Sequence, residues 1–183
     1  MATDLTSLTA TVQAIVRWTA QKGVDMSTPA DAATLAIKES ITFGTGNNAS
    51  DMIWHDRRLI VAAATDTLDL AGSLTNVWGV TVTFTKIHAI LVHNRSDETL
   101  TEAVEGVAHT ANAAIIEVTT SAANGFLLFK TAADAKILAA GDWMVAYSKA
   151  GMAVTAATGD LLDIIETATL EAAYDIVLIG ESA

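Results

Sequence analysis

The sequence predicts an all-β protein, an antiparallel β-sandwich with the strand order of a jelly roll. After residue 36 there are about ten short apolar segments, and turn residues separate them at near-regular spacing. No apolar stripe of helical period continues over this part of the chain. Regularly spaced short strands are typical of sandwiches and barrels. A non-repeating antiparallel pattern favours the double-sheet jelly roll.

Composition excludes several other classes. Of the 183 residues, 51% are hydrophobic and 17% are charged, so a mostly disordered chain is excluded. No stretch approaches the roughly 20 consecutive apolar residues that a membrane helix needs. The N-terminus lacks a positively charged region, so no secretory signal is expected. The 35 alanines favour helices, but their runs are short and are flanked by Thr, Asn, Asp or Gly.

Charge and cysteine content narrow the possible partners. The net charge is −11, and the only adjacent basic pair is Arg57-Arg58. Because nucleic-acid affinity comes largely from Lys and Arg on phosphates, we expect no nucleic-acid partner and no anionic membrane partner. The absence of cysteine excludes disulfides, thiolate metal sites and cysteine nucleophiles.

Residues 1–36 are expected to form an arm, helical or extended, separate from a β-sandwich domain of residues 37–183. Within the arm, the good helix formers Ala, Gln, Arg and Lys favour a short amphipathic helix over residues 5–22, ending at Gly23. Residues 24–36, with the single proline, are expected to be a connector. Two periodicities coexist: a helical one at Leu5, Leu8, Val12, Ile15 and Thr19, and a strand-like one at Val12, Ala14, Val16 and Trp18.

The expected strands follow in order. The segment 80–94 has the strongest pattern, and its alternation changes phase near Lys86, which indicates a β-bulge or two strands meeting at a bend. The last two segments are expected to form a hairpin. The segments are 37–43, 58–64, 66–70, 80–94, 114–119, 125–129, 143–148, 152–154, 161–167 and 174–179.

No catalytic, cofactor-binding or metal-ligating residue is predicted. Residues 44–49 match the dinucleotide pattern G-x-G-x-x-A, but no helix or βαβ unit follows, so a glycine-containing loop is favoured. The segment 54–58 (Trp-His-Asp-Arg-Arg) could hold a His–Asp pair. Adjacent strand residues point to opposite faces, however, so a rim segment with Arg57 or Arg58 paired to a carboxylate is favoured.

Histidines and acidic residues give only weak metal signals. His55, His88, His93 and His109 make no H-x-H or H-x-x-x-H pair, although ligands from distant strands stay possible. No calcium-loop motif is present, and the acidic residues are expected in solvated turns. They are Asp66, Asp69, Asp97, Glu98, Glu102 and Glu105. The four tryptophans, Trp18, Trp54, Trp78 and Trp143, are expected to be core or interface anchors.

Several segments resemble a family of tailed-bacteriophage virion proteins. The resemblance extends over residues 34–180. It is carried by FGTGNNASDMIWHDRRL at 43–59, TLDLAG at 67–72, LTNVWG at 74–79, FTKIHAILVHN at 84–94 and YDIVLIG at 174–180. None of these motifs is catalytic, so no functional residue is carried over. The resemblance implies a structural, non-enzymatic role in the virion, often on the head.

Two functions and a minor third are therefore expected. The first is a capsid decoration or cement protein that binds the major capsid protein, as a homo-oligomer for which capsid symmetry suggests a trimer. In it the arm makes the capsid contact. The second is a tail, baseplate or head-fibre component that binds the host, for example through carbohydrate stacked on Trp78 or Trp143. The third is a cupin-like metal enzyme, which would need two or more of the histidines as ligands.

Overall fold

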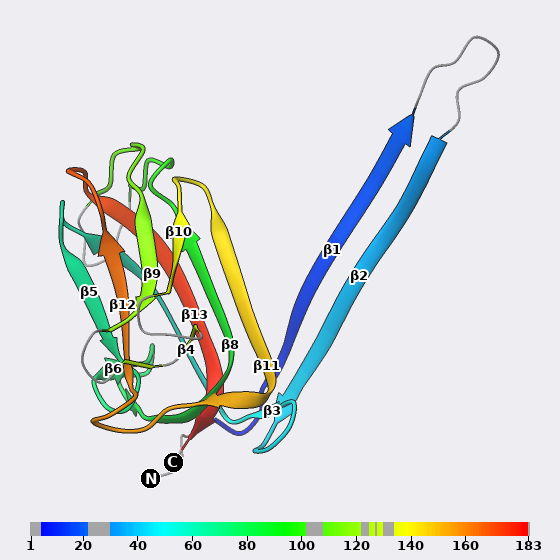
Figure 1. Ribbon diagram of the computed structural model, residues 1–183. Coiled ribbons are helices and arrows are strands. Elements are labelled where there is room, and N and C mark those ends of the chain that lie inside the picture. Colours follow the sequence, from blue (N-terminus) through cyan, green and yellow to red (C-terminus); the bar gives the residue numbers. More distant parts are fainter. Residues whose placement is uncertain are drawn as a thin grey trace.

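The computed structural model describes residues 5–21, 30–101, 108–121, 125, 126, 128, 129 and 134–182. These residues contain strands and no helix, which confirms the predicted all-β antiparallel architecture. Two four-stranded sheets form a sandwich, and a long two-stranded arm projects from it (Figure 1). One sheet has the order β11-β8-β13-β4: Trp143–Ala153, Phe84–Asn94, Ala172–Ser182 and Met52–Ile60. The other has the order β10-β9-β12-β5: Ala135–Leu138, Ile116–Thr120, Leu161–Glu166 and Thr65–Asp69.

The strands of the sandwich pair in a nested order. Strand β4 pairs with β13, β5 with β12, β8 with β11, and β9 with β10, all antiparallel. This nesting is compatible with the jelly roll expected from the sequence. The predicted final hairpin is wrong, because β12 and β13 lie in different sheets. The linking residues, 167–171, cross between the sheets and contain none of the turn sequences that close tight hairpins.

The core lies between the two sheets. Alternate residues of each strand point inward, and the largest of these buried side chains include Phe84 and Tyr174; Phe126, outside the strands, is also buried in the core. The Tyr174 hydroxyl donates a hydrogen bond to Asp66 (2.8 Å) on the opposite sheet. Burial, together with the nearby Asp66 carboxylate, raises the pKa of Tyr174 well above its ordinary value, so this hydroxyl stays a donor. Trp54 is buried as well and donates to the Thr75 carbonyl (3.0 Å) in the small β6–β7 hairpin, Leu74–Thr75 and Thr81–Val82.

The phase change near Lys86 is a pair of β-bulges within one strand, β8. Its pairing with β13 is shifted on either side of Lys86, where Thr85 and His88 have no partner in the register. Gly180 of β13 makes this possible, because a Cβ at that position would lie 2.1 Å from the Lys86 carbonyl oxygen. The bulges bring the two strand backbones too close for any side chain there.

The arm consists of strands and not of the favoured N-terminal helix. Strand β1, Thr9–Gln21, pairs antiparallel with β2, Ala30–Phe43, and β3, Ala49–Ser50, adds two parallel pairs at the base of β2. The helix prediction is wrong because pairing along the full length of β2 satisfies the β1 backbone. Strand β2 runs uninterrupted through residues 36 and 37. Residues 22–29, including Pro29, lie outside the described residues.

Four further segments differ from expectation. The expected strand 58–64 is only the end of β4, which stops at Ile60, and residues 62 and 63 lie in a turn. The two expected segments 143–148 and 152–154 form one strand, β11 (Trp143–Ala153), with a register shift between Tyr147 and Met152. The described residues of 125–129 form only an isolated bridge, Gly125↔Leu161. Strand β10 was not predicted, because its apolar residues, Ile137 and Leu138, are adjacent and do not alternate.

Candidate interaction surface

The arm has two chemically different faces. Paired residues share a face, and faces alternate along each strand. We call one face the apolar face: Ala10, Val12, Ala14, Val16, Trp18 and Ala20 of β1 with Asp31, Ala33, Leu35, Ile37, Glu39 and Ile41 of β2. The opposite face, the polar face, is rich in Thr, Ser and Gln and includes Ile15, Arg17 and Lys38. The two basic residues of β1 and β2 are thus on the polar face, and the two acidic residues are on the apolar face.

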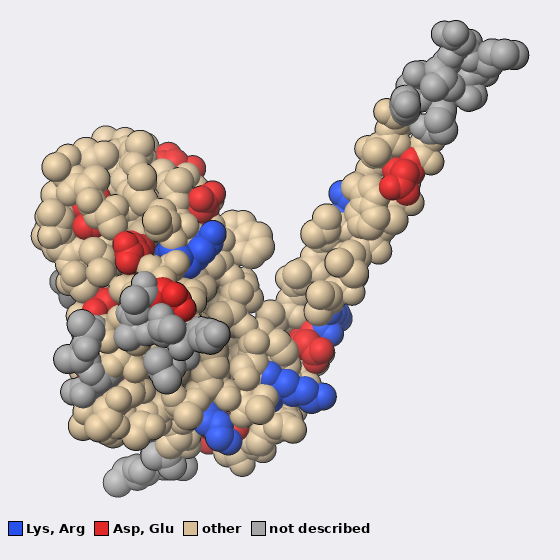
Figure 2. Space-filling model, in the orientation of Figure 1, with Lys and Arg blue, Asp and Glu red and all other residues tan. Residues whose placement is uncertain are grey.

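Most of the apolar face is not covered by the rest of the chain. Val16, Leu35 and Ile37 are between 56% and 58% exposed, although such side chains are normally buried in a sandwich core. Figure 2 shows the arm standing away from the sandwich, with an open wedge between them and few charged groups along the arm. A two-stranded hairpin is at best marginally stable in water when nothing packs on it. The apolar face is therefore a candidate interaction surface.

Only the base of the apolar face is packed, and it packs on the outer face of the β11-β8-β13-β4 sheet. Leu8, Ala10, Val12 and Ile41 form one hydrophobic cluster with a row of sheet residues. We call this row the first row; its members are paired across the four strands and are Tyr147, Ala89, Ile179 and Ile53. All the β1 and β2 side chains that are not exposed belong to the apolar face near this contact.

The outer face of the same sheet continues beyond the arm. The second row consists of Val145, Leu91, Val177 and His55, and the third row of Trp143, His93, Asp175 and Arg57. Trp143 is 61% exposed, and Val145 and Leu91 are also exposed. The apolar members of these rows, Val145, Leu91, Val177 and Trp143, therefore form a second apolar surface of the sheet. Figure 1 shows the arm diverging from this sheet.

Ion pairs border the third row. Arg57 Nε donates to Asp175 Oδ1 (2.7 Å), and Arg95 Nη1 donates to Asp175 Oδ2 (2.6 Å). Burial alone would raise the pKa of Asp175, but its hydrogen bonds with these two guanidinium groups hold it below its ordinary value. Arg95 also pairs with Glu98. Two cations therefore share the Asp175 carboxylate at this end of the sheet.

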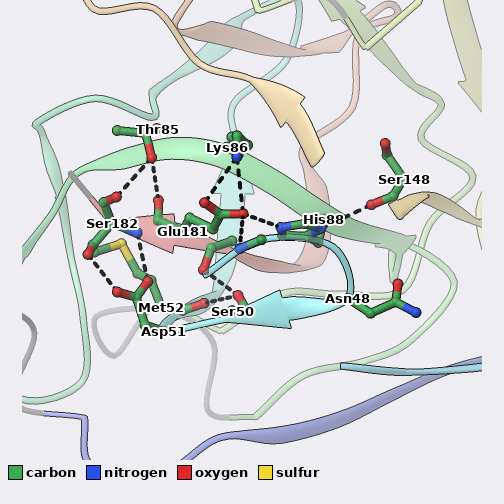
Figure 3. Close-up of polar contacts among 12 residues, drawn as sticks. Asn48, Ser50, Asp51, Met52, Thr85, Lys86, His88, Ser148, Glu181 and Ser182 are labelled. Carbon is green, nitrogen blue, oxygen red and sulfur yellow. Dashed lines mark hydrogen bonds and ion pairs between the residues drawn. The ribbon is translucent and has the colours of Figure 1, made fainter. Parts of the chain in front are cut away.

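A buried polar cluster anchors the base of the arm to the sandwich (Figure 3). Glu181 of β13 accepts from the backbone N–H of Gly46 (3.0 Å), from Lys86 Nζ (3.1 Å) and from His88 Nε2 (2.9 Å) when that nitrogen carries a proton. The other ring nitrogen of His88 lies 3.1 Å from the Ser148 carbonyl oxygen. Burial opposes ionisation of Glu181, but these donors outweigh it and hold the pKa of its carboxyl below its ordinary value.

The loop between β2 and β3 is tied down by the same cluster. Gly44 and Gly46 have φ values of 134° and 104°, in the region that favours glycine, so the glycine loop expected here is confirmed. The Ser50 hydroxyl donates to the Gly180 carbonyl, and Asn48 bonds to Tyr147. These contacts hold the base of the arm in place. The Gly44-x-Gly46 sequence has a structural role, because it forms the loop that leads from β2 to β3.

The segment 54–58 behaves as the sequence favours. Arg57 pairs with Asp175, and Arg58 pairs with Asp66 (2.5 Å) and Asp56 (3.0 Å). Asp56 bonds to Arg58 and to the Arg57 N–H, whereas the neighbouring His55 lies exposed in the second row. The alternative His–Asp pair is not formed.

The other candidate residues are spread over the sandwich. His109 lies 3.3 Å from Glu171, His88 belongs to the arm anchor, and His55 and His93 lie on the outer sheet face. Among the described residues, no group of three or more His, Asp or Glu side chains is placed to hold a metal ion. Asp66 differs from the expected solvated turn, because it lies in β5 and bonds to Arg58 and Tyr174.

The remaining acidic residues and the tryptophans divide between turns, ion pairs and surface. Asp69 also differs from the expected solvated turn, because it is the half-buried last residue of β5 and accepts from the Ala71 N–H of the turn that follows. Asp97 is exposed, and Glu98 pairs with Arg95. Glu102 and Glu105 lie outside the described residues. Trp54 is a core residue, and Trp18, Trp78 and Trp143 are surface residues.

The interaction surface combines residues that no sequence motif linked. The rows draw on four strands that are far apart in sequence, so only the pairing register reveals them. The arm did give a signal, which was the alternation of Val12, Ala14, Val16 and Trp18. In the part of the chain that the structure describes, no helix is long and apolar enough to cross a membrane. Comparison with protein-family models, curated proteins and solved structures finds no match for this chain.

Proposed function

We propose that the protein is a structural protein of a bacteriophage particle, a homo-oligomeric capsid decoration protein without enzymatic activity. The observation that carries this proposal is the projecting arm, whose two faces are exposed over most of their length. Such an arm has little reason to persist in a protein that acts alone, because it adds exposed apolar surface and unpaired strand edges. The resemblance of residues 34–180 to virion proteins is the reason for proposing that the protein acts in a phage particle.

The polar face of the arm is the proposed contact with the major capsid protein. It combines hydroxyl and amide side chains with Arg17 and Lys38, all exposed. Polar contacts of this kind are individually weak, but repetition over a symmetric lattice raises the overall affinity by avidity. Arg17 and Lys38 are basic groups on a chain whose net charge is −11. Because opposite charges attract across an interface, these two cations favour an acidic patch on the capsid partner.

Reversing the charge of the polar face tests this contact. We expect the double variant Arg17→Glu, Lys38→Glu to lose at least about tenfold in affinity for capsid shells that lack the protein. The reason is that like charges then face each other at every contact of the lattice. Co-sedimentation with purified shells measures it. The matched control, Lys136→Glu with Lys149→Glu, makes the same change in charge at exposed lysines outside the arm. Equal binding by both double variants would show that the polar face makes no capsid contact.

A host-binding role in a tail, baseplate or head fibre is the second candidate, and the exposure of Trp78 and Trp143 favours it. Trp78 is 65% exposed and lines a surface pocket with Leu5, Leu8, Ile53 and Val80. The Asn76 side chain holds the loop by accepting from the Trp78 and Val80 N–H groups (3.0 Å each). An exposed indole on a held loop, next to a hollow, is suited to stacking on a sugar ring.

Glycan binding separates the two candidates. If the protein binds the host through carbohydrate, a glycan array should give specific signals that Trp78→Ala removes, because the apolar face of the sugar loses its stacking surface. Trp18→Ala, which removes an exposed indole from the arm, is the control and should leave the signals in place. An array without signal for the wild type would count against host binding through sugar.

A further inference from the structure

We infer that the apolar face of the arm binds the outer face of the β11-β8-β13-β4 sheet of a second copy of this chain. The contact covers the second and third rows of that sheet with the arm residues beyond Val12. The inference rests on the proposed role as a homo-oligomeric structural protein, and it names the surfaces through which the copies associate. The polar face is left free for the capsid.

The arm's own base shows which surface fits the apolar face. Ala10, Val12 and Ile41 already pack on the first row of the sheet, between flat β surfaces whose apolar side chains interdigitate. The next residues of the arm, Ala14, Val16 and Leu35, are similar in kind, and so are Val145, Leu91 and Val177 in the next row of the sheet. The uncovered parts of both surfaces are thus continuations of one existing contact.

The chain cannot extend this contact within itself as it is folded. The hydrophobic cluster at the arm base includes the first row and Val177 of the second. Farther out the arm diverges from the sandwich, and an open wedge separates the two (Figure 2). The buried anchor at Glu181 and the Gly44–Gly46 loop fix the base from which the arm leaves. A second copy of the chain offers both surfaces. Its arm can cover the exposed rows of the sheet, and its sheet can cover the apolar face of the arm.

The far ends of the two surfaces also agree in charge. The apolar face carries acidic residues and no basic ones, with Asp31 bonded to Trp18 Nε1 (3.0 Å) near its far end. The third row has Arg57, which shares Asp175 with Arg95. Arg95 pairs with Glu98 as well, whereas Arg57 has only its share of Asp175, so an approaching carboxylate meets a guanidinium group at Arg57 that shares its one carboxylate partner.

The size of the contact explains why it should be reciprocal. From Ala14 to Ala20 the arm extends about 20 Å at roughly 3.3 Å per residue, with the width of two strands. One such contact is small beside the roughly 1,000 Å² that a stable interface buries. Mutual exchange gives every copy two contacts, one through its arm and one through its sheet, and closes the assembly symmetrically.

Solution mass measured by light scattering after size exclusion tests the inference on the full-length protein without capsids. We expect the wild type to have the mass of two or more chains of 19.1 kDa each. The Val16→Asp or Leu35→Asp variant should have the mass of one chain. Ile15→Asp is the matched control, because Ile15 is also exposed but lies on the polar face next to Val16. Circular dichroism checks that each variant keeps its strand content.

The sheet side of the contact is tested in the same way and by cross-linking. Val145→Asp should give a single-chain mass just as Val16→Asp does. Because the chain has no cysteine, Val16→Cys protein can be mixed with Val145→Cys protein and treated with a short bis-maleimide. A product of twice the chain mass is expected for this mixture, and little or none when Ile15→Cys replaces Val16→Cys.

The outcomes separate this inference from the proposed function. A single-chain mass for the wild type, or equal effects of Val16→Asp and Ile15→Asp, would overturn the arm contact. Loss of association with Val16→Asp but not with Val145→Asp would show that the arm does not bind the sheet of the second copy. The arms of two copies would then pack on each other. Capsid binding is measured separately on shells, so a protein that oligomerises through the arm but ignores shells contradicts the proposed function alone.

Discussion

Gly180→Ala is expected to lower the free energy of unfolding by about 3 kcal/mol, as overpacking in a tight core does. The new Cβ would lie 2.1 Å from the Lys86 carbonyl oxygen and 2.7 Å from Phe84 Cδ1. The first of these atoms is backbone, so the β8 and β13 strands must separate at the bulge. Denaturant unfolding measures the effect, and thermal melting should show a decrease of about 10 °C for a chain of this size.

Gly72→Ala is the matched control for this prediction. A Cβ at Gly72 meets nothing within 4 Å, and this glycine lies in an exposed turn. We therefore expect its stability to stay within about 0.5 kcal/mol of the wild type. If Gly180→Ala were equally mild, the close approach of β8 and β13 at the bulge would be contradicted.

The sandwich could be predicted because its signals are local. Alternation along segments such as 161–167 and turn residues between them are properties of neighbouring residues, and they set the fold class. The partners of each strand depend on residues far away in sequence. Strands β12 and β13 are consecutive, yet each pairs with two strands from earlier in the chain. The expected final hairpin failed because adjacency in sequence does not determine pairing.

The arm shows why two patterns in one segment are hard to separate. Helix propensities differ by only a few tenths of a kcal/mol per residue, so the preference of Ala, Gln, Arg and Lys is easily outweighed. In the structure, residues 9–21 each face a partner between 30 and 42, and the apolar pairs Val16↔Leu35 and Ala14↔Ile37 lie on one face. The first half of the partner strand, residues 30–36, lay in the expected connector, and its second half, 37–43, was assigned to the sandwich domain, so the pairing with residues 9–21 was not recognised.

The anchor of the arm was beyond prediction for a related reason. His88 and Glu181 are 93 residues apart, and Gly46 is 135 residues from Glu181. The sequence identifies Gly44 and Gly46 as loop glycines, but it does not show that the Gly46 N–H meets a buried carboxylate. Arg57 and Arg58 were easier, since an arginine on a half-buried strand needs a carboxylate wherever the fold supplies one.

Glu181→Gln is expected to cost about 2 to 3 kcal/mol of stability at neutral pH, because hydrogen bonds to a charged acceptor are replaced by neutral ones and His88 faces an amide. The carboxyl of Glu181 is buried and is contacted by Lys86, His88 and the Gly46 N–H. Its pKa in the folded protein lies below the ordinary value of 4.5. Its contribution to stability is therefore complete above pH 4.5 and is lost as the pH falls through the folded-state pKa.

The difference between wild type and Glu181→Gln should consequently shrink in acid. We expect urea unfolding to give the full difference in stability above pH 4.5, the ordinary pKa of a glutamate, and a difference that closes as the pH falls through the lowered folded-state pKa. The wild type then carries a protonated carboxyl, which resembles the glutamine amide in shape and charge. The control is Glu117→Gln, at a half-buried position on β9, which should follow the wild-type curve. A gap that persists unchanged in acid would mean that Glu181 stabilises the base of the arm by its shape and not by its charge.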